Sequence, residues 1–223
     1  MFFIGDVHGC FYKYEQLTKN KKIDCSIQLG DMGIGFPTTM KALSIGKYLY
    51  GVKTFAPNKG KNHKFIRGNH DDPELCEKHP QYLGDFGYLE NGIFFVSGGI
   101  SIDKHMRTEW IDWWRNEELS FTKQKQVIEL YKKCKPSIVI SHECPTEIKS
   151  DMINYRYLKT KIASQTEKLL QSLLDIHRPD YWIFGHYHMK RIRKIKGTNF
   201  IALDEFMNGE IENCYFELPE LKF

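Results

Sequence analysis

Short apolar runs along this chain alternate with amphipathic segments of helical period. The apolar runs predict β-strands over residues 1–5, 25–30, 63–67, 93–98, 136–141, 180–185, 198–203 and 211–216. The amphipathic segments predict helices over residues 11–20, 37–50, 72–79, 121–134 and 161–176. Pro73 suits the first turn of the third helix, and Asp71 is expected to cap that helix. This alternation of strands and helices indicates an α/β architecture.

The segment 100–120 is unusual because it holds three of the four tryptophans, namely Trp110, Trp113 and Trp114. Their spacing is that of one helix face, so we favour a helix whose tryptophan stripe faces the core. The alternative is that the segment forms a lid or wall of an active site. In that case a basic side chain would reach the substrate, either His105 or Arg107.

Five of the apolar runs are followed directly by a polar motif containing Asp, Asn or His. The motifs are Gly5-Asp6-Val7-His8-Gly9, Gly30-Asp31, Gly68-Asn69-His70-Asp71, Ser141-His142 and Gly185-His186-Tyr187-His188. Strands that point the same way end at one edge of a sheet, and open α/β sheets bind their ligands there. We therefore expect the five motifs to form one site.

The chemistry of these motifs points to metal ions. Carboxylate and imidazole groups suit manganese, iron and zinc, and sulfur is absent from every motif. Asp6 and His8 lie two residues apart at a strand end, which directs both side chains to one face. The two oxygens of Asp31 could bridge a pair of ions. Two ions sharing that carboxylate would use the whole candidate set, which is Asp6, His8, Asp31, Asn69, His142, His186 and His188.

Length and composition indicate an ordinary globular protein. The motifs extend through most of the 223 residues, so we expect a single domain over residues 1–223. Hydrophobic residues make up 41% of the chain and charged residues 27%. No secretion signal or apolar run of ~20 residues is present, and the six cysteines form no CxxC pair. We expect a cytoplasmic protein with free thiols and no membrane partner; the sequence does not predict an oligomeric state.

The net charge of +4, from 32 basic and 28 acidic residues, is mild. A basic run at residues 190–196 follows the last motif and is expected to be a solvated strand or turn, although it could steer an anionic substrate. A dedicated nucleic-acid protein would show a stronger, clustered excess of positive charge. A nucleic-acid partner is therefore possible but not favoured.

Taken in order, the motifs GDVHG, LGD, RGNHD, SHECP and GHYH resemble the signature of the calcineurin-like metallophosphoesterases. That signature is D-x-H, GD, GNH followed by Asp or Glu, a lone His, and GHxH, and the match covers about residues 1–190. The resemblance implies a four-layer αββα sandwich, in which two mixed β-sheets are flanked by helices and the metal site lies at strand ends.

The resemblance also implies a residue-by-residue ligand set for two divalent ions. The first ion would be held by Asp6, His8, Asp31 and His188. The second would be held by Asp31, Asn69, His142 and His186. We expect manganese, with iron or zinc as alternatives.

The implied activity is hydrolysis of a phosphate ester, either a monoester or a diester. Two ions ~3.5–4 Å apart neutralise the phosphoryl oxygens and supply a bound hydroxide as nucleophile. His70 would be the general acid that protonates the leaving group. Asn69 and Arg67 would contact the substrate phosphate, Arg67 through bidentate bonds.

The second motif departs from the pattern of the protein Ser/Thr phosphatases in this superfamily. Those enzymes have Asp and Arg where this chain has Ile34 and Gly35. Their Asp orients the catalytic histidine and their Arg binds phosphate, so a close relationship to them is disfavoured. A nuclease or nucleic-acid end phosphatase remains an alternative. A non-catalytic interaction scaffold is disfavoured, because the ligand set and His70 are complete.

Overall fold

The computed structural model describes residues 1–36, 62–153 and 164–221. Its α-helices are α1 (Phe11–Asn20), α4 (Pro73–Glu77), α5 (Phe121–Cys134), α6 (Lys149–Met152) and α8 (Gln165–Ile176). Its short 3-10 helices are η1 (Lys104–Met106), η2 (Thr146–Ile148) and η3 (Ile211–Asn213). The helix predicted at 37–50 lies outside the described residues, as do the first residues of the helix predicted at 161–176. No helix among the described residues has the length and apolar character needed to cross a bilayer.

The strands form two mixed sheets. The four-stranded sheet has the order β10-β1-β2-β3, built from β1 (Phe2–Ile4), β2 (Cys25–Leu29), β3 (Asn62–Ile66) and β10 (Tyr215–Glu217). The six-stranded sheet has the order β4-β5-β6-β7-β9-β8, built from β4 (Phe86–Tyr88), β5 (Ile93–Val96), β6 (Ile138–Ser141), β7 (Tyr181–Phe184), β8 (Arg191–Ile195) and β9 (Thr198–Ala202). In the six-stranded sheet the inner pairings are parallel and both edge pairings, β4 with β5 and β8 with β9, are antiparallel. In the four-stranded sheet only the pairing of β10 with β1 is antiparallel, and the other edge strand, β3, pairs with β2 in parallel.

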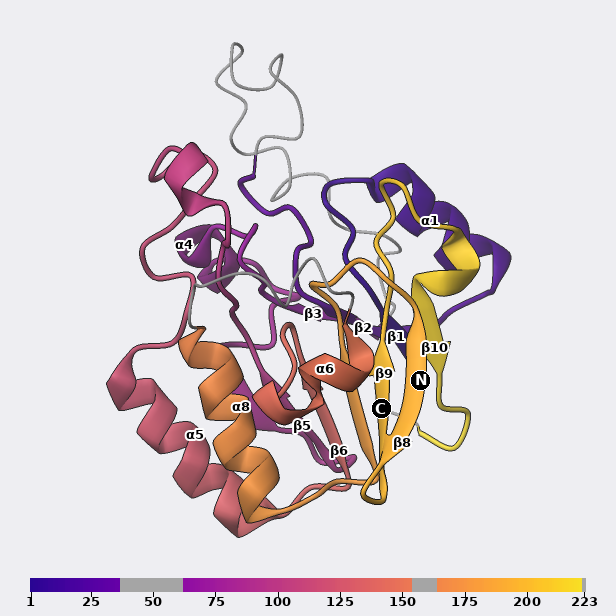
Figure 1. Ribbon diagram of the computed structural model, residues 1–223. Helices are drawn as coiled ribbons and strands as arrows, with labels where there is room; N and C mark the ends of the chain where they lie inside the picture. Colours follow the sequence, from indigo (N-terminus) through magenta and orange to yellow (C-terminus); the bar gives the residue numbers. More distant parts are fainter. Residues whose placement is uncertain (37–61, 154–163, 222–223) are drawn as a thin grey trace.

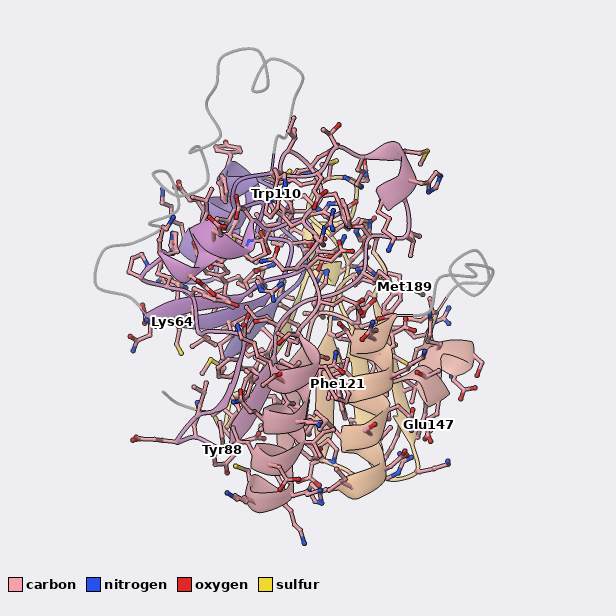
Figure 2. The ribbon with its side chains drawn as sticks, turned by 90° about the vertical axis from the view of Figure 1, so that its left-hand side faces the viewer. Lys64, Tyr88, Trp110, Phe121, Glu147 and Met189 are labelled. Atoms are coloured by element: carbon pink, nitrogen blue, oxygen red, sulfur yellow. The ribbon has the colours of Figure 1, made fainter. Side chains whose placement is uncertain are left out.

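The two sheets pack face to face, and helices cover their outer faces. Buried residues from both sheets form the central layer, among them Phe3, Ile27, Phe95, Ile140 and Ile183. Helices α5 and α8 lie side by side over the six-stranded sheet, while α1 lies on the other side of the molecule (Figures 1 and 2). The prediction of an αββα sandwich with two mixed sheets is therefore confirmed.

Strand β8 explains the basic run at 190–196. Among the residues that the structure describes, it pairs only with β9, in antiparallel register, and so forms a sheet edge. Ile192 on this strand is 53% exposed. Charged side chains on an edge strand discourage pairing with other chains, so the expected exposed strand is confirmed and has a structural reason.

The segment 100–120 differs from its prediction. Within it the structure has turns and the short helix η1 instead of an α-helix. Trp114 is 1% exposed, but Trp110 is 60% exposed and has a φ of +68°. The Trp110 N–H donates to the Trp113 carbonyl at 2.8 Å, which folds the chain back on itself. The prediction of one core-facing tryptophan stripe is therefore wrong.

Candidate metal centre

All five polar motifs come together, but not at the edge of a single sheet. Asp6, Asp31 and Asn69 follow strands β1, β2 and β3 of the four-stranded sheet. The motifs of His142 and His186 follow β6 and β7 of the six-stranded sheet. The site lies across the ends of both sheets, so the expectation of one sheet edge is wrong. Periodicity in a single strand cannot reveal which of two packed sheets that strand joins.

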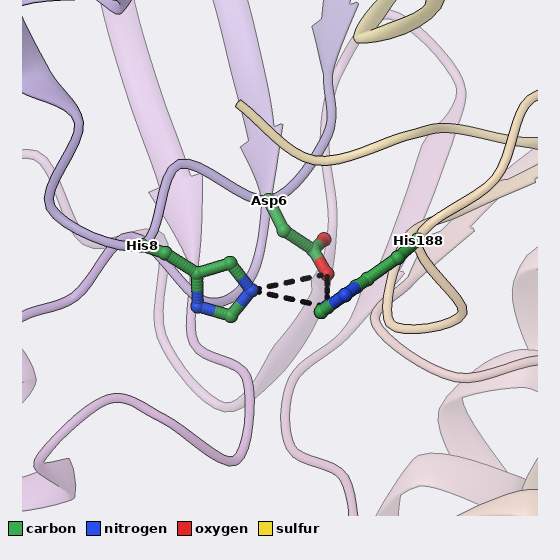
Figure 3. A group of neighbouring side chains, drawn as sticks. All are labelled: Asp6, His8 and His188. Carbon is green, nitrogen blue, oxygen red and sulfur yellow. Dashed lines mark hydrogen bonds and ion pairs between the residues drawn. The ribbon is translucent and has the colours of Figure 1, made fainter. Parts of the chain in front are cut away.

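One group of candidate ligands consists of Asp6, His8 and His188 (Figure 3). The Nε2 atoms of the two histidines are 3.1 Å apart. The Asp6 Oδ2 atom lies 3.5 Å from Nε2 of His188 and 3.9 Å from Nε2 of His8. Asp6 is fully buried, and its Oδ2 accepts a hydrogen bond of 2.9 Å from the His186 N–H. This bond ties the first motif to the last.

A second group converges on Nε2 of His142. This atom lies 3.1 Å from Oδ1 of Asn69, 3.2 Å from Nδ1 of His186 and 3.3 Å from Oδ1 of Asp31. The other oxygen of Asp31, Oδ2, lies 3.8 Å from Nε2 of His8 in the first group. The Asp31 carboxylate therefore lies between the two groups, with one oxygen facing each.

The protonation pattern of the cluster fits divalent cations. Nδ1 of His142 lies 2.9 Å from the Leu29 carbonyl, and donating to it leaves Nε2 facing the cluster, where a cation would displace the Nε2 proton. Burial alone would lower the pKa of His142, but Asp31 and Asp6 outweigh burial and raise it to about 10. Burial would raise the pKa of Asp31, yet His142 and His70 hold it well below its usual value. Imidazole, carboxylate and amide oxygen in this arrangement suit ions of the manganese, iron and zinc type.

The backbone of the candidate ligands is strained. Four of them have a positive φ: His8 at 47°, Asp31 at 56°, His186 at 67° and His188 at 48°. The left-handed region costs a side-chain-bearing residue about 1–2 kcal/mol, and such conformations concentrate at functional sites. The structure thus gives an argument for function that residue types alone could not give.

Two glycines allow the carboxylates to approach the backbone closely. A Cβ atom on Gly185 would lie 2.1 Å from Oδ1 of Asp6. A Cβ atom on Gly68 would lie 2.1 Å from Oδ1 of Asp31. Two nonbonded heavy atoms cannot approach to 2.1 Å, so the glycines of the GHYH and GNHD motifs are required by space.

Asp71 has a different role from the one predicted. Asp72 caps α4, accepting hydrogen bonds from the N–H groups of the first helical turn. Asp71 is fully buried, and its carboxylate accepts from Gly33 N at 2.7 Å, Ile34 N at 2.9 Å and Gly68 N at 2.9 Å. It therefore fixes the loop after β2 against the loop after β3, and the prediction that Asp71 is a helix cap is wrong.

His70 lies beside the bridging carboxylate. Its N–H donates to Oδ1 of Asp31 at 2.8 Å, and its Nδ1 lies 3.9 Å from Oδ2 of that residue. The imidazole stacks on Phe36, with ring centroids 4.6 Å apart and planes 5° from parallel. Burial lowers the pKa of His70 to about 3, and the charge of Asp31 acts against burial.

The position of Arg67 gives no support to its predicted contact with substrate. The side chain is buried, with Nε donating to Oδ1 of Asp85 at 3.1 Å and Nη1 donating to the Glu117 carbonyl at 2.6 Å. The side chain is only 3% exposed, so Arg67 does not form a surface ion pair either. These contacts indicate that Arg67 stabilises the fold.

Two cavities open beside the cluster, with volumes of about 290 Å³ and about 180 Å³. Both are lined by His70, Arg107 and His188. The smaller cavity also reaches Asp31 and Asn69. Of the two basic residues proposed for the segment 100–120, Arg107 lines both cavities, whereas His105 is exposed and lines neither. The expectation of an active-site wall is supported for this part of the segment.

Sequence reasoning missed the residues that support the ligands. Glu143 is fully buried, and its Oε1 lies 3.5 Å from Nε2 of His186. Ser101 accepts a hydrogen bond of 3.1 Å from the Asn69 amide, which leaves the amide oxygen facing His142. Glu143 could have been suspected from its place next to His142 in the SHECP motif. Ser101 carries no comparable signal.

Comparison with family models matches residues 1–190 to the calcineurin-like phosphoesterases. The chain therefore belongs to this family and is a metallophosphoesterase, an enzyme class that hydrolyses phosphoric esters with divalent metal ions. A comparison of the sequence with curated proteins finds no match.

Two solved structures share the fold at low sequence identity. A dimetal phosphatase from Danio rerio is 11% identical, with a TM-score of 0.58 over 92% of this chain and 87% of that chain. A Staphylococcus aureus protein provisionally assigned as a 5'-nucleotidase is 14% identical, with a TM-score of 0.51 over 92% of this chain and 48% of that chain. At these identities the likeness concerns the fold alone.

Proposed function

We propose that this enzyme hydrolyses phosphate esters with two divalent cations bridged by Asp31, and with His70 as the proton donor. The observation that carries the proposal is the orientation of the Asp31 carboxylate. One oxygen faces His8 at 3.8 Å and the other faces His142 at 3.3 Å. A carboxylate between two groups of nitrogen and oxygen atoms is the arrangement that a bridging ligand requires.

The first cation would be held by Asp6, His8, Asp31 and His188, and the second by Asp31, Asn69, His142 and His186. Manganese is the proposed ion, with iron and zinc as alternatives that the same ligand types accept. When bound, two such cations neutralise phosphoryl oxygens and lower the pKa of coordinated water. The remaining chemistry falls to side chains around them.

His70 is suited to proton transfer by its position, whereas its lowered pKa opposes the protonated form. It lines both cavities, and its ring is fixed by stacking on Phe36. Burial favours the neutral imidazole. An anionic phosphoryl group beside the ring would favour the protonated form, in the same sense as Asp31. The proton would then pass from His70 to the leaving oxygen as the ester bond breaks.

A role in nucleic-acid processing is not favoured by the arrangement of basic residues. The basic run at 190–196 forms an edge strand and does not line either cavity. Lys190 instead donates to the Tyr215 carbonyl at 2.6 Å. Monoesters and diesters of small molecules are the proposed substrate class.

Metal content and turnover should be measured together, using a chromogenic phosphomonoester and phosphodiester with Mn²⁺, Fe²⁺ or Zn²⁺. The wild type should bind two ions per chain and hydrolyse at least one ester. Asp31→Asn should bind fewer ions and lose turnover. His70→Asn should keep both ions and lose about 10²–10⁴-fold in kcat, the usual contribution of a general acid. A doubly loaded wild type that hydrolyses neither ester would overturn the proposal.

A further inference from the structure

Arg107 is a cationic side chain at the candidate site that the metal chemistry does not use. It lies in the segment between β5 and α5 and lines both cavities together with His70. Its side chain is 15% exposed. The guanidinium is half-buried and already pairs with the carboxylate of Asp103, and its cavity side is where the anionic group of a substrate would lie.

Asp103 fixes the orientation of this guanidinium. Nε of Arg107 donates to Oδ1 of Asp103 and Nη2 donates to Oδ2, each at 2.6 Å. Nη1 makes a longer contact of 3.4 Å with the Asp112 carbonyl. A guanidinium has five N–H groups, so these contacts leave one on Nη1 and one on Nη2. Nη1 and Nη2 thus each keep an N–H to donate to the oxygens of a phosphate.

Phe36 contacts both Arg107 and the proposed proton donor, His70. The Cζ atom of Arg107 lies 5.4 Å from the centre of the Phe36 ring. The other stacking partner of that ring is His70, at 4.6 Å. The guanidinium and the imidazole therefore contact the same aromatic ring, and both line the same two cavities. A phosphoryl group bound by the arginine fork would lie close to the group that protonates its leaving oxygen.

We propose that Arg107, oriented by Asp103, binds the phosphoryl group, and that the substrate is a phosphomonoester. This inference rests on the proposed function. A monoester has three non-bridging oxygens, so it can contact two cations and still offer oxygens to an arginine fork. A diester has only two such oxygens, and the cations compete with the arginine for both. Arg107 should therefore favour monoesters over diesters, with Asp103 as a positioning residue.

The test compares Arg107→Ala and Arg107→Lys with a matched control in the same segment. Arg115 is 76% exposed and also forms a two-bond pair with a carboxylate, that of Glu109, so Arg115→Ala is the control. Arg107→Ala should lower kcat/KM for the monoester by roughly 100-fold, the loss expected for two charge-assisted hydrogen bonds. It should change diester hydrolysis by less than about 3-fold on the same argument. Arg107→Lys should restore only part of the loss, because an ammonium lacks the planar fork.

A second measurement does not depend on turnover. Inorganic phosphate should bind to the ion-loaded Arg107→Ala enzyme at least ~10-fold more weakly than to the wild type, by calorimetry. The metal content of Arg107→Ala should equal that of the wild type. Arg115→Ala should match the wild type in both phosphate affinity and metal content. Asp103→Asn should weaken phosphate binding in the wild type and have no further effect in Arg107→Ala, because the carboxylate acts through the arginine.

The possible failures are distinguishable. An unchanged phosphate affinity, or equal losses on the monoester and the diester, would overturn the role of Arg107 while leaving the proposed hydrolysis in place. An ion-loaded wild type that hydrolyses neither ester would overturn the proposed function, and the monoester assignment with it.

Discussion

At the scale of single residues, a buried charged group in this protein either belongs to the candidate metal cluster or stabilises the fold. Burial alone does not show which of these two roles a residue has. Asp6 and Asp71 are both fully buried. Asp6 faces two histidines, whereas Asp71 accepts from backbone N–H groups. The sequence identified the candidate ligands because their types recur at strand ends. It could not assign Asp71 or Arg67, because their partners are backbone groups or distant side chains.

Asp85→Asn should destabilise the fold, because it leaves the buried guanidinium of Arg67 without its carboxylate. Removing one partner of a buried pair costs roughly 3 kcal/mol or more in the free energy of unfolding. Urea denaturation near pH 7 should show this loss. The exposed pair of Glu109 and Arg115 is the control, and Glu109→Gln should leave the free energy of unfolding nearly unchanged. Equal costs for the two substitutions would contradict this interpretation.

The pH dependence of the same variant follows from the pKa of Asp85. Burial would raise this pKa, but Arg67 and Lys123 outweigh burial and hold it below the usual value. A depressed folded-state pKa adds stability above the unfolded-state pKa of ~3.9 and loses it as the pH falls through the folded value. The difference in stability between the wild type and Asp85→Asn should therefore be full at neutral pH and shrink below about pH 4.

Gly185→Ala should lower metal affinity without unfolding the protein. The added methyl group would displace the Asp6 carboxylate, which lies 2.1 Å from the Cβ position. Misplacing a ligand or its support usually costs about 10–100-fold in metal affinity. Gly87→Ala meets the ring of Phe95, which is not a candidate ligand, and serves as the control for tight packing. Metal content after dialysis should fall in the first variant and not in the second.

At the scale of elements, the amphipathic helices were predicted most accurately. Helices α1 and α5 have the predicted bounds. Their apolar faces are set by local period, and packing on a sheet reinforces that preference. The strand expected at 211–216 is reduced to β10 at Tyr215–Glu217, after helix η3. The helix predicted for the segment 100–120 does not form. The contacts that the segment makes with the site and within itself determine its structure, and its hydrophobic periodicity does not.

Helices α5 and α8 both begin at a serine N-cap, but replacing each serine by alanine should have different effects. Ser164 caps α8, accepting from Glu167 N at 3.0 Å, and also donates to Oε2 of Glu143 at 2.6 Å. Ser120 caps α5 with a single longer bond of 3.4 Å. Ser164→Ala should cost about 2 kcal/mol, and Ser120→Ala about 1 kcal/mol or less.

Only Ser164→Ala should also weaken metal binding, because Glu143 contacts His186. Chemical denaturation and metal titration of both variants would check this pair of expectations. Equal metal affinities in the two variants would show that Glu143 does not position the histidine.

At the scale of the whole molecule, the candidate ligands come from loops of both sheets. The order of motifs and the family resemblance were enough to predict the sandwich, the convergence of the motifs and the class of chemistry. The sequence named Arg107 only as one of two candidates for an active-site wall, because choosing between them requires the path of an irregular segment. Such paths depend on contacts between residues far apart in sequence, which have no local pattern.

Removing divalent cations should lower the thermal stability of the molecule, because bound ions would join the two sheets. Ions at ~100 times their Kd add about 2.7 kcal/mol, which corresponds to roughly 5–10 °C in Tm for a chain of this size. The gain should decline as the pH falls from about 8 to 6, because ions must displace protons from groups such as His142. Scanning calorimetry with manganese or a chelator measures both effects. An Asp31→Asn protein should respond less than the wild type.

The left-handed backbone at four of the candidate ligands lowers the stability of the fold, while the side chains at those positions are the ones that the proposed chemistry needs. His188 has a φ of 48°, so His188→Gly should raise the free energy of unfolding by about 1 kcal/mol in the absence of ions. A library selected only for heat resistance in the presence of a chelator should therefore accumulate glycine at such positions and lose turnover. Selection for activity at the same temperature should retain the histidine and gain its heat resistance elsewhere in the fold.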